Sequence, residues 1–150
     1  MQIDSILDGI PSDKICIYSL IDVCSRRAYA EPTIGINSHK SSQFVRRAKN
    51  IVPFTVQLIQ SDHGSEFAKW FTKQLLSQGI EHRHSRVRKP ADNRHIERFN
   101  RTIQQECLSH IPRTLKSWQK NIPDFIHYYN TERPHMGLGM KTPLEVMQRC

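Results

Sequence analysis

The hydrophobic pattern of this chain changes its period partway along, and that change limits the fold more than any other feature. Residues 2–7, 14–23 and 26–34 are rich in β-forming residues and are joined by short links. They predict three strands in an antiparallel meander, with a turn at residues 8–13. Beyond residue 37, apolar residues recur at helical spacing and short strand-like runs lie between them. The order predicts an α/β or α+β sheet covered by helices.

The later part of the chain is expected to alternate helices with two short strands. The predicted strands are residues 54–60 and 80–84. The predicted helices are residues 38–50 with Ser38 as cap, residues 65–78, a helix after Pro90, and residues 115–129 with a break or bend at Pro123.

Several details of these helices can be checked in a structure. In the 65–78 helix, the apolar face is expected to carry Phe67, Trp70, Phe71 and Leu75, opposite Lys69 and Lys73. Gly79 is expected to end it in a left-handed conformation. In the helix after Pro90, the apolar face should carry Ile96, Phe99, Ile103 and Cys107. Residues 142–145 predict a capped terminal turn with a first-turn proline.

Composition favours a single domain, residues 1–150, with a polyanionic partner. Lys and Arg together number 22 against 14 Asp and Glu, which gives a net charge of +8 and a pI near 9.6. Nucleic acid is the commonest partner of so basic a chain. The N-terminus lacks the regions of a signal peptide, and no apolar run approaches a membrane span. We therefore expect a cytoplasmic protein.

Four cysteines occur at spacings that match neither a zinc site nor a disulfide framework. We expect buried or reduced thiols at all four positions, as is usual in the cytoplasm. The positions are Cys16, Cys24, Cys107 and Cys150.

Three acids stand where chemistry is possible. Asp4 lies in the first predicted strand, Asp62 ends the fourth before a glycine-containing turn, and Glu97 lies in the helix after a basic loop. Strand ends of α/β sheets are favoured places for active sites. Taken singly, each acid also has an ordinary structural interpretation: a solvated chain end, a turn residue and a salt-bridged surface residue.

The helix that carries Glu97 has a strongly basic face. At about 100° per residue, one face carries Arg94, Glu97, Arg98, Arg101 and Gln105. A surface that binds phosphate through arginine and holds one carboxylate for a metal has this pattern, and so does an ordinary solvated face. The pattern leaves both interpretations open.

Several segments, in order, resemble the core of DDE transposases of bacterial insertion sequences, whose fold and acidic triad retroviral-type integrases share. The resemblance extends from residue 2 to about residue 147. The segments are residues 2–5, 20–26, 61–67, 91–100, 129–138 and 142–145.

This resemblance implies a ribonuclease H-like fold: a five-stranded mixed sheet, three strands antiparallel and then two parallel, flanked by helices. The C-terminal tail, about residues 111–150, would pack on the core. By position, Asp4, Asp62 and Glu97 match the catalytic triad. They would hold two Mg²⁺ or Mn²⁺ ions about 3.5–4 Å apart for DNA strand cleavage and strand transfer. Asp22 matches a recurring structural acid that is expected to pair near Ser25 or Arg26.

The resemblance also places a basic loop beside the site, so DNA is the expected partner, as element ends and as target. A homodimer is expected because two DNA ends must be paired. Asn93 and Arg98 match motif positions that support substrate or Glu97, and residues 133–135 would dock the tail. His63, His82 and His84 are expected to be plain polar residues. The predicted DNA-contacting residues are Arg83, Arg86, Arg88, Lys89, Arg94, Arg98 and Arg101.

The chain departs from the family pattern at two points. Thirty-four residues separate Asp62 from Glu97, one fewer than the commonest spacing, and the intervening loop can absorb the deletion. Such transposases normally carry a helix-turn-helix region before the core, whereas Met1 stands three residues before Asp4. We therefore expect that region to be absent, and activity of the bare core to be weak and nonspecific.

Two alternative functions remain open from the sequence. One is a catalytically inactive DNA-binding transposase remnant with the same fold. The other is a ribonuclease H-like nuclease that acts on RNA–DNA hybrid. The presence of all three acids favours a recombinase over the remnant, and the Arg-Pro-His segment at 133–135 favours it over the nuclease.

Overall fold

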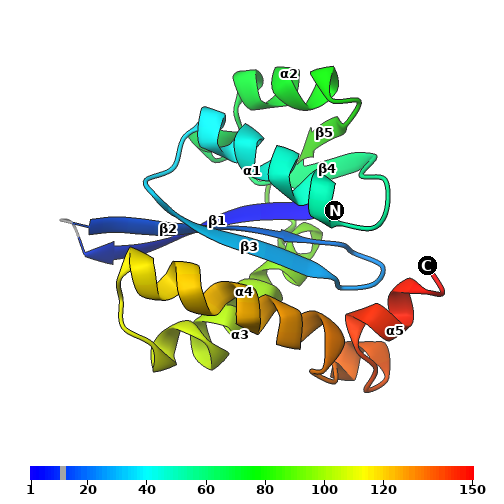
Figure 1. Ribbon diagram of the computed structural model, residues 1–150. Coiled ribbons are helices and arrows are strands. Elements are labelled where there is room, and N and C mark those ends of the chain that lie inside the picture. The colour runs from blue at the N-terminus through cyan, green and yellow to red at the C-terminus, as the bar shows by residue number, and fades with distance from the viewer. Residues whose placement is uncertain (11–12) are drawn as a thin grey trace.

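The computed structural model describes residues 1–10 and 13–150, which form a sheet with helices on both faces (Figure 1). The five strands of the described chain follow the order β3-β2-β1-β4-β5. The first three pair antiparallel, whereas β4 joins β1 and β5 joins β4 in parallel. The expected mixed sheet, three antiparallel strands and then two parallel ones, is confirmed.

The elements have the following bounds. The strands are β1 (Gln2–Ile10), β2 (Asp13–Ile21), β3 (Ala28–Ile34), β4 (Leu58–Ser61) and β5 (Glu81–His84). The helices are α1 (Ser38–Ile51), α2 (Lys69–Ser77), α3 (Arg94–Glu106), α4 (Leu115–Thr131) and α5 (Pro143–Met147). Short 3₁₀ turns occupy Ser65–Phe67, Pro90–Asp92, Leu108–His110 and Met136–Leu138. None of the described helices is long and apolar enough to cross a membrane.

Helices α3 and α4 cover one face of the sheet, and α1 and α2 lie on the other side (Figure 1). Successive residues of a strand point to opposite faces. Accordingly, Ile3 packs with the α1 and α2 side chains, whereas Ile6 packs against the α3 and α4 cluster. Gln2 and Asp4 therefore face α3, to which both are hydrogen-bonded. This alternation brings the first candidate acid to the α3 side.

The first hairpin is longer than predicted. Its backbone pairs Gln2 with Ile21 and continues as far as Ile10 and Asp13, so most of the predicted 8–13 turn is strand. Antiparallel pairing extends these strands because each added residue satisfies backbone groups of its partner. The remaining turn residues, Pro11 and Ser12, lie outside the described residues.

The strand predicted at residues 54–60 is β4, which is shorter and begins later in the chain than expected. It begins at Leu58 because its partner strand β5 begins at Glu81, opposite Leu58. The predicted strand at residues 80–84 is confirmed as β5. The predicted Ser38 cap was also wrong. Asn37 is the N-cap of α1, and its side-chain oxygen accepts a hydrogen bond from the Lys40 N–H at 2.9 Å.

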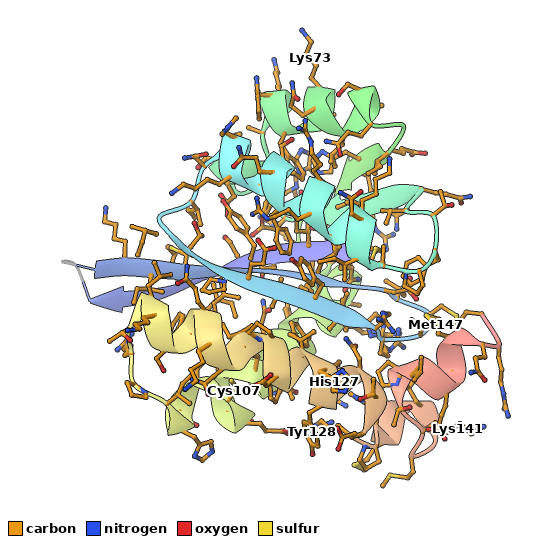
Figure 2. All side chains as sticks on the ribbon, in the orientation of Figure 1. Lys73, Cys107, His127, Tyr128, Lys141 and Met147 are labelled. Atoms are coloured by element: carbon orange, nitrogen blue, oxygen red, sulfur yellow. A yellow bond between two sulfur atoms is a disulfide. The ribbon has the colours of Figure 1, made fainter. Side chains whose placement is uncertain are left out.

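The predicted helix 65–78 is divided into a 3₁₀ turn and α2. Phe67, Phe71 and Leu75 are buried as expected, but Trp70 is 43% exposed. Within α2, Trp70 lies about 100° around the helix from Phe71 and about 140° from Leu75, at the edge of the apolar face. Lys73 points away from the sheet on the outer side of α2 (Figure 2). Gly79 has φ +75° and ends the helix as predicted.

Helix α4 continues through Pro123 without interruption, so of the predicted break or bend at this residue the break is wrong. Pro123 lies on the exposed side, where the carbonyl that its ring leaves unpaired can meet water. The buried side packs against β3, and its aromatic residues include Trp118 and Tyr129. Packing of that side holds the helix across the proline.

The C-terminal tail packs back on α3 and α4, as predicted for residues 133–135. Arg133 forms two hydrogen bonds with the Glu106 carboxylate, at 2.6 and 2.8 Å. The buried His135 ring contacts the Tyr129 carbonyl at 3.0 Å. The capping box of Thr142 and Glu145 is present at the start of α5.

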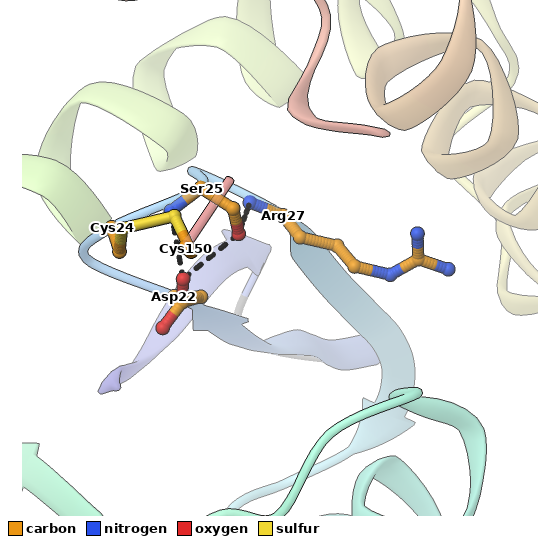
Figure 3. Close-up of a disulfide and its surroundings, with 5 residues drawn as sticks. All are labelled: Asp22, Cys24, Ser25, Arg27 and Cys150. Carbon is orange, nitrogen blue, oxygen red and sulfur yellow. Dashed lines mark hydrogen bonds between the residues drawn. A yellow bond between two sulfur atoms is a disulfide. The ribbon is translucent and has the colours of Figure 1, made fainter. Parts of the chain in front are cut away.

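The expectation of thiols was wrong for two of the four cysteines, because Cys24 and Cys150 form a disulfide (Figure 3). These residues are 126 positions apart, and folding brings their Cα atoms to 6.4 Å, a separation that no spacing motif reveals. Cys16 and Cys107 are free and buried as expected. Near the disulfide, the predicted structural role of Asp22 is confirmed, since its carboxylate accepts hydrogen bonds from the Ser25 N–H and hydroxyl, both at 2.8 Å.

Candidate active site

Asp4 lies at the centre of the candidate site, on the α3 side of β1. One carboxylate oxygen accepts from the Ser5 N–H at 2.8 Å, and the other accepts from the Asn100 side-chain amide at 2.7 Å. Burial raises the pKa of Asp4 to about 6; the Ser5 hydrogen bond acts against this rise, and nearby carboxylates add to it. The charged form of Asp4 therefore lacks compensating positive charge in this fold.

Asp62 follows β4 directly, at the carboxyl end of a strand parallel to β1. The register pairs Gln2 with Gln60, so each acid lies two residues beyond a paired position. The Asp62 carboxylate is exposed and accepts a hydrogen bond from the Gly64 N–H at 2.9 Å. A strand end followed by an Asx-type turn thus presents this acid beside Asp4.

Glu66 is a fourth carboxylate at the site, and sequence reasoning missed it. It is buried, with 8% exposure, and accepts a hydrogen bond from the Ser5 hydroxyl at 2.6 Å. A Cβ at position 64 would lie 2.6 Å from one Glu66 oxygen and 3.0 Å from Asp62 Oδ1, so a larger residue there would displace the Glu66 side chain. The carboxylates of Asp62 and Glu66 therefore both lie close to Gly64.

Glu97 lies on the exposed face of α3, between buried Ile96 and exposed Arg98. Among the charges that raise the pKa of Asp4, Asp62 acts most strongly, then Glu66, then Glu97. The structure thus brings all three predicted acids into one electrostatic neighbourhood. Within the described residues, however, no three His, Cys, Asp or Glu side chains lie close enough together to hold a metal ion.

Asn100 ties α3 to this neighbourhood. Besides its bond to Asp4, its side-chain oxygen accepts from the Ser19 hydroxyl at 2.6 Å in a buried contact. The sequence held a signal for this role. Asn100 is a polar residue at helical spacing between buried Ile96 and Ile103, and a buried amide requires partners. Glu66 gave no such signal, since an acid in a polar turn is usually solvated.

The three histidines of this region form polar contacts. His82 lies between the Ser61 and Thr72 hydroxyls, at 2.9 and 2.6 Å, and burial lowers its pKa to about 4. His63 and His84 stack with ring centroids 4.9 Å apart. The His84 ring also contacts the Asp62 carbonyl at 2.8 Å. The His82 and His84 rings therefore contact the end of β4, next to Asp62.

The predicted DNA-contacting residues divide into two groups. Arg86 is held by the Asp92 carboxylate through its Nε and Nη2 at 3.0 and 2.8 Å, and this pairing lowers the pKa of Asp92 well below its usual range. Arg83 donates from Nε to the Gln60 side-chain oxygen at 2.9 Å. The remaining predicted residues are exposed, and none of them forms an ion pair with the described part of the chain: Arg88, Lys89, Arg94, Arg98 and Arg101.

Comparison with known families agrees with this arrangement. Two family models, both described as integrase core domain, match residues 1–90 and residues 78–143. The first alone covers more than half of the chain. The chain belongs to the integrase core domain family. Its membership agrees with the resemblance that the motif segments carry.

The curated relatives are longer than this chain and match it over part of their length. The chain is 27% identical over 146 residues to the transposase InsD for insertion element IS2D of Escherichia coli (strain K12), which covers 91% of this chain. The chain spans 48% of that transposase, about half its length. The match therefore concerns one part of the longer protein.

Solved structures share the fold. The catalytic core domain of BIV integrase matches 99% of this chain with a TM-score of 0.72 and 18% identity, over 93% of that domain. The HTLV-2 integrase catalytic core domain, solved in complex with magnesium, matches 97% of this chain with a TM-score of 0.73 and 18% identity, over 93% of its own chain. These likenesses establish the ribonuclease H-like integrase-core fold.

Proposed function

We propose that this chain is the catalytic core of a DDE-type transposase or integrase, which cleaves DNA strands and joins them to target DNA. Membership of the integrase core domain family supports this activity. The observation that carries it is the setting of Asp4, a largely buried carboxylate influenced by Asp62, Glu66 and Glu97. A fold that gathers negative charge around a desolvated acid is suited to receive cations.

On this proposal, Asp4, Asp62 and Glu97 would hold two Mg²⁺ or Mn²⁺ ions. Carboxylate oxygens are the ligands that these hard cations prefer, and magnesium retains several waters, so few protein ligands suffice. When bound, such ions stabilise the attacking and leaving oxygens of an in-line phosphoryl transfer. Asn100 and Ser5 would hold Asp4 in place, and the Gly64 N–H would orient Asp62.

We propose that DNA, as element ends and as target, lies across the exposed basic face of α3 and the loop before it. Arg94, Arg98 and Arg101 project from that face beside Glu97. Such contacts would neutralise phosphates without reading sequence, so binding would weaken as salt rises. Arg86, already paired with Asp92, would contribute less than the others.

We further propose that residues 1–150 act as one domain, as a homodimer that pairs two DNA ends, in the bacterial cytoplasm near the nucleoid. Bacterial insertion-sequence transposases among the relatives support the location. Thiols are usually kept reduced there, so the Cys24–Cys150 bond would be open in that compartment.

The test is DNA nicking and strand joining on a short duplex with Mg²⁺ or Mn²⁺, using the parent chain and Asp62→Asn. We expect metal-dependent cleavage that the substitution abolishes. Asp124→Asn, which changes an exposed acid on α4, is the matched control and should retain activity. If neither parent nor variant cleaves while both bind DNA, the chain is an inactive DNA-binding remnant. Cleavage confined to RNA–DNA hybrid would instead favour a ribonuclease H-like nuclease.

A further inference from the structure

We propose that Gln2 and Gln60 are positioning residues, which set the helix carrying Glu97 against the strands carrying Asp4 and Asp62. This inference rests on the proposed function of those acids. It concerns how the third carboxylate, on a helix, is placed relative to two carboxylates on strands. Catalysis by such a site depends on that placement, because small errors in geometry are costly.

The strand register puts the two glutamines side by side. Gln2 and Gln60 are partners in the parallel β1–β4 pair, and each precedes an acid by two residues. A strand repeats its side-chain direction every two residues, so Gln2 projects to the same face as Asp4. Both glutamines are only 5% exposed. A pair of buried amides therefore lies directly beside the pair of acids.

Both amides bind the segment that leads into α3. Gln2 Nε2 and Gln60 Nε2 donate to the same acceptor, the Asp92 carbonyl, the latter at 2.6 Å. Gln60 Nε2 also lies 3.1 Å from the Asn93 side-chain oxygen. Two neighbouring strands thus hold one peptide carbonyl just before the helix begins.

Gln2 also supplies the cap that the helix lacks locally. The first N–H groups of a helix have no partner within it. Asn93, the N-cap residue of α3, makes no side-chain capping bond. Instead, Gln2 Oε1 accepts a hydrogen bond from the Ile96 N–H at 3.0 Å. The residue next to Ile96 is Glu97, so the cap acts one residue from the candidate ligand.

Asn100 provides a second point of attachment one turn later. Its amide binds Asp4 and Ser19, whereas Gln2 binds the backbone at Ile96. Glu97 lies between these two attachments. Two polar contacts on one side of a helix restrict its rotation about its own axis, which apolar packing alone restricts less, since hydrophobic attraction has no preferred direction. The direction in which Glu97 projects follows from this restriction.

Glutamine suits this role because one side chain both donates and accepts. Its amide carries two donors and an acceptor at the end of a flexible stem, whereas glutamate at neutral pH cannot donate and methionine offers only a weak acceptor. The side-chain oxygen of Gln60 is also used, since it accepts a hydrogen bond from Arg83 Nε at 2.9 Å. Loss of these bonds would leave a buried carbonyl and a helix N–H without partners.

The first experiment follows the helix start directly, in the metal-free chain. Amide hydrogen exchange is measured by NMR for the parent, Gln2→Met and Gln60→Met, with Gln57→Met, an exposed glutamine of the preceding segment, as matched control. In Gln2→Met, the Ile96 amide should exchange about 10-fold faster, while the mid-helix Ile103 amide keeps its parent rate. Gln57→Met should match the parent at both amides.

The second experiment measures Mn²⁺ binding by calorimetry and the Mn²⁺ dependence of DNA nicking for the same four proteins. In Gln2→Met and Gln60→Met, the Mn²⁺ dissociation constant and the half-saturating Mn²⁺ concentration should rise about 10-fold or more. Nicking at saturating Mn²⁺ should recover most of the parent rate, because the ligands themselves remain. Gln57→Met should keep the parent values.

Each outcome decides one of the two proposals. Unchanged Ile96 exchange and unchanged Mn²⁺ dependence in both variants would overturn the positioning role. So would faster exchange at Ile96 and Ile103 alike without a change in Mn²⁺ binding, since that would indicate general destabilisation. If the parent shows no metal-dependent nicking, or Asp62→Asn retains it, the proposed function fails, while Ile96 exchange still reports whether the amides hold α3.

Discussion

Helices α3 and α4 cover the same face of the sheet, and each buries one asparagine, yet the two asparagines serve different parts of the molecule. Asn100 on α3 binds the side chains of Asp4 and Ser19. Asn130 on α4 binds backbone, accepting from the Ala28 N–H at 2.9 Å and donating to the Ala28 carbonyl at 2.8 Å. One amide reaches a candidate catalytic group, and the other occupies hydrogen-bonding groups of an edge strand.

This difference indicates how the two helices divide their tasks. β3 lies at the edge of the sheet, where unpaired backbone groups invite association. Asn130 satisfies Ala28 there, and Pro32 offers no N–H farther along the strand. Helix α4 therefore completes the fold, whereas α3, with its charged outer face and its bonds to Asp4 and Gln2, orients the candidate site. Substitutions in α4 should change stability, and substitutions in α3 should change activity.

The largest expected effect is on stability, from Trp118→Ala in α4. Trp118 is fully buried in the cluster beneath β3, so truncation should leave a cavity and lower the free energy of unfolding by about 3–5 kcal/mol. Chemical denaturation measures the change, with Trp70→Ala, at 43% exposure, as control. Equal losses for the two tryptophans would contradict the assignment of α4 as the structural helix.

The second prediction exchanges the two asparagines for leucine. Because Asn100→Leu removes a donor to Asp4, it should lower metal-dependent nicking about 10–100-fold. Asn130→Leu leaves the Ala28 groups without partners, so it should lower stability by about 1–3 kcal/mol while nicking per folded molecule is retained. Nicking rates and denaturation curves are measured for both variants. Loss of nicking in Asn130→Leu, measured on folded protein, would remove the distinction between the helices.

The smallest effect concerns the ion pair that joins the end of α3 to the residues after α4. Its Arg133 hydrogen bonds lower the pKa of Glu106. A carboxyl whose folded pKa is depressed stabilises the protein above its unfolded value, and this contribution disappears as pH falls through the folded pKa. Since Glu106 is 39% exposed, Glu106→Gln should cost under about 1 kcal/mol at pH 7.

Thermal unfolding between pH 7 and pH 3 tests this prediction. The difference between parent and Glu106→Gln should shrink once the pH falls below the usual glutamate value of 4.5. Glu81→Gln, at an exposed position of β5, should show no comparable difference. A Glu106→Gln deficit that stays constant with pH would indicate lost packing rather than a lost ion pair.

Most local elements and the family can be predicted from the order of the amino acids alone. Strand-like alternation and helical spacing identified the sheet, the apolar face of α3 and the Thr142 cap, because each depends on residues only a few positions apart. The motif segments identified the family, which the family comparison bore out. The acids Asp4, Asp62 and Glu97 were selected from those segments, and their catalytic roles stay predictions.

Contacts between distant groups emerge only when the chain is folded. The pairing of Cys24 with Cys150, the Ser5–Glu66 contact, and the bonds of Gln2 and Gln60 to the start of α3 join residues 32 to 126 positions apart. Periodicity records which side of an element is buried, but not which partner it meets there. The partner depends on strand register and helix packing, which arise from the whole chain at once.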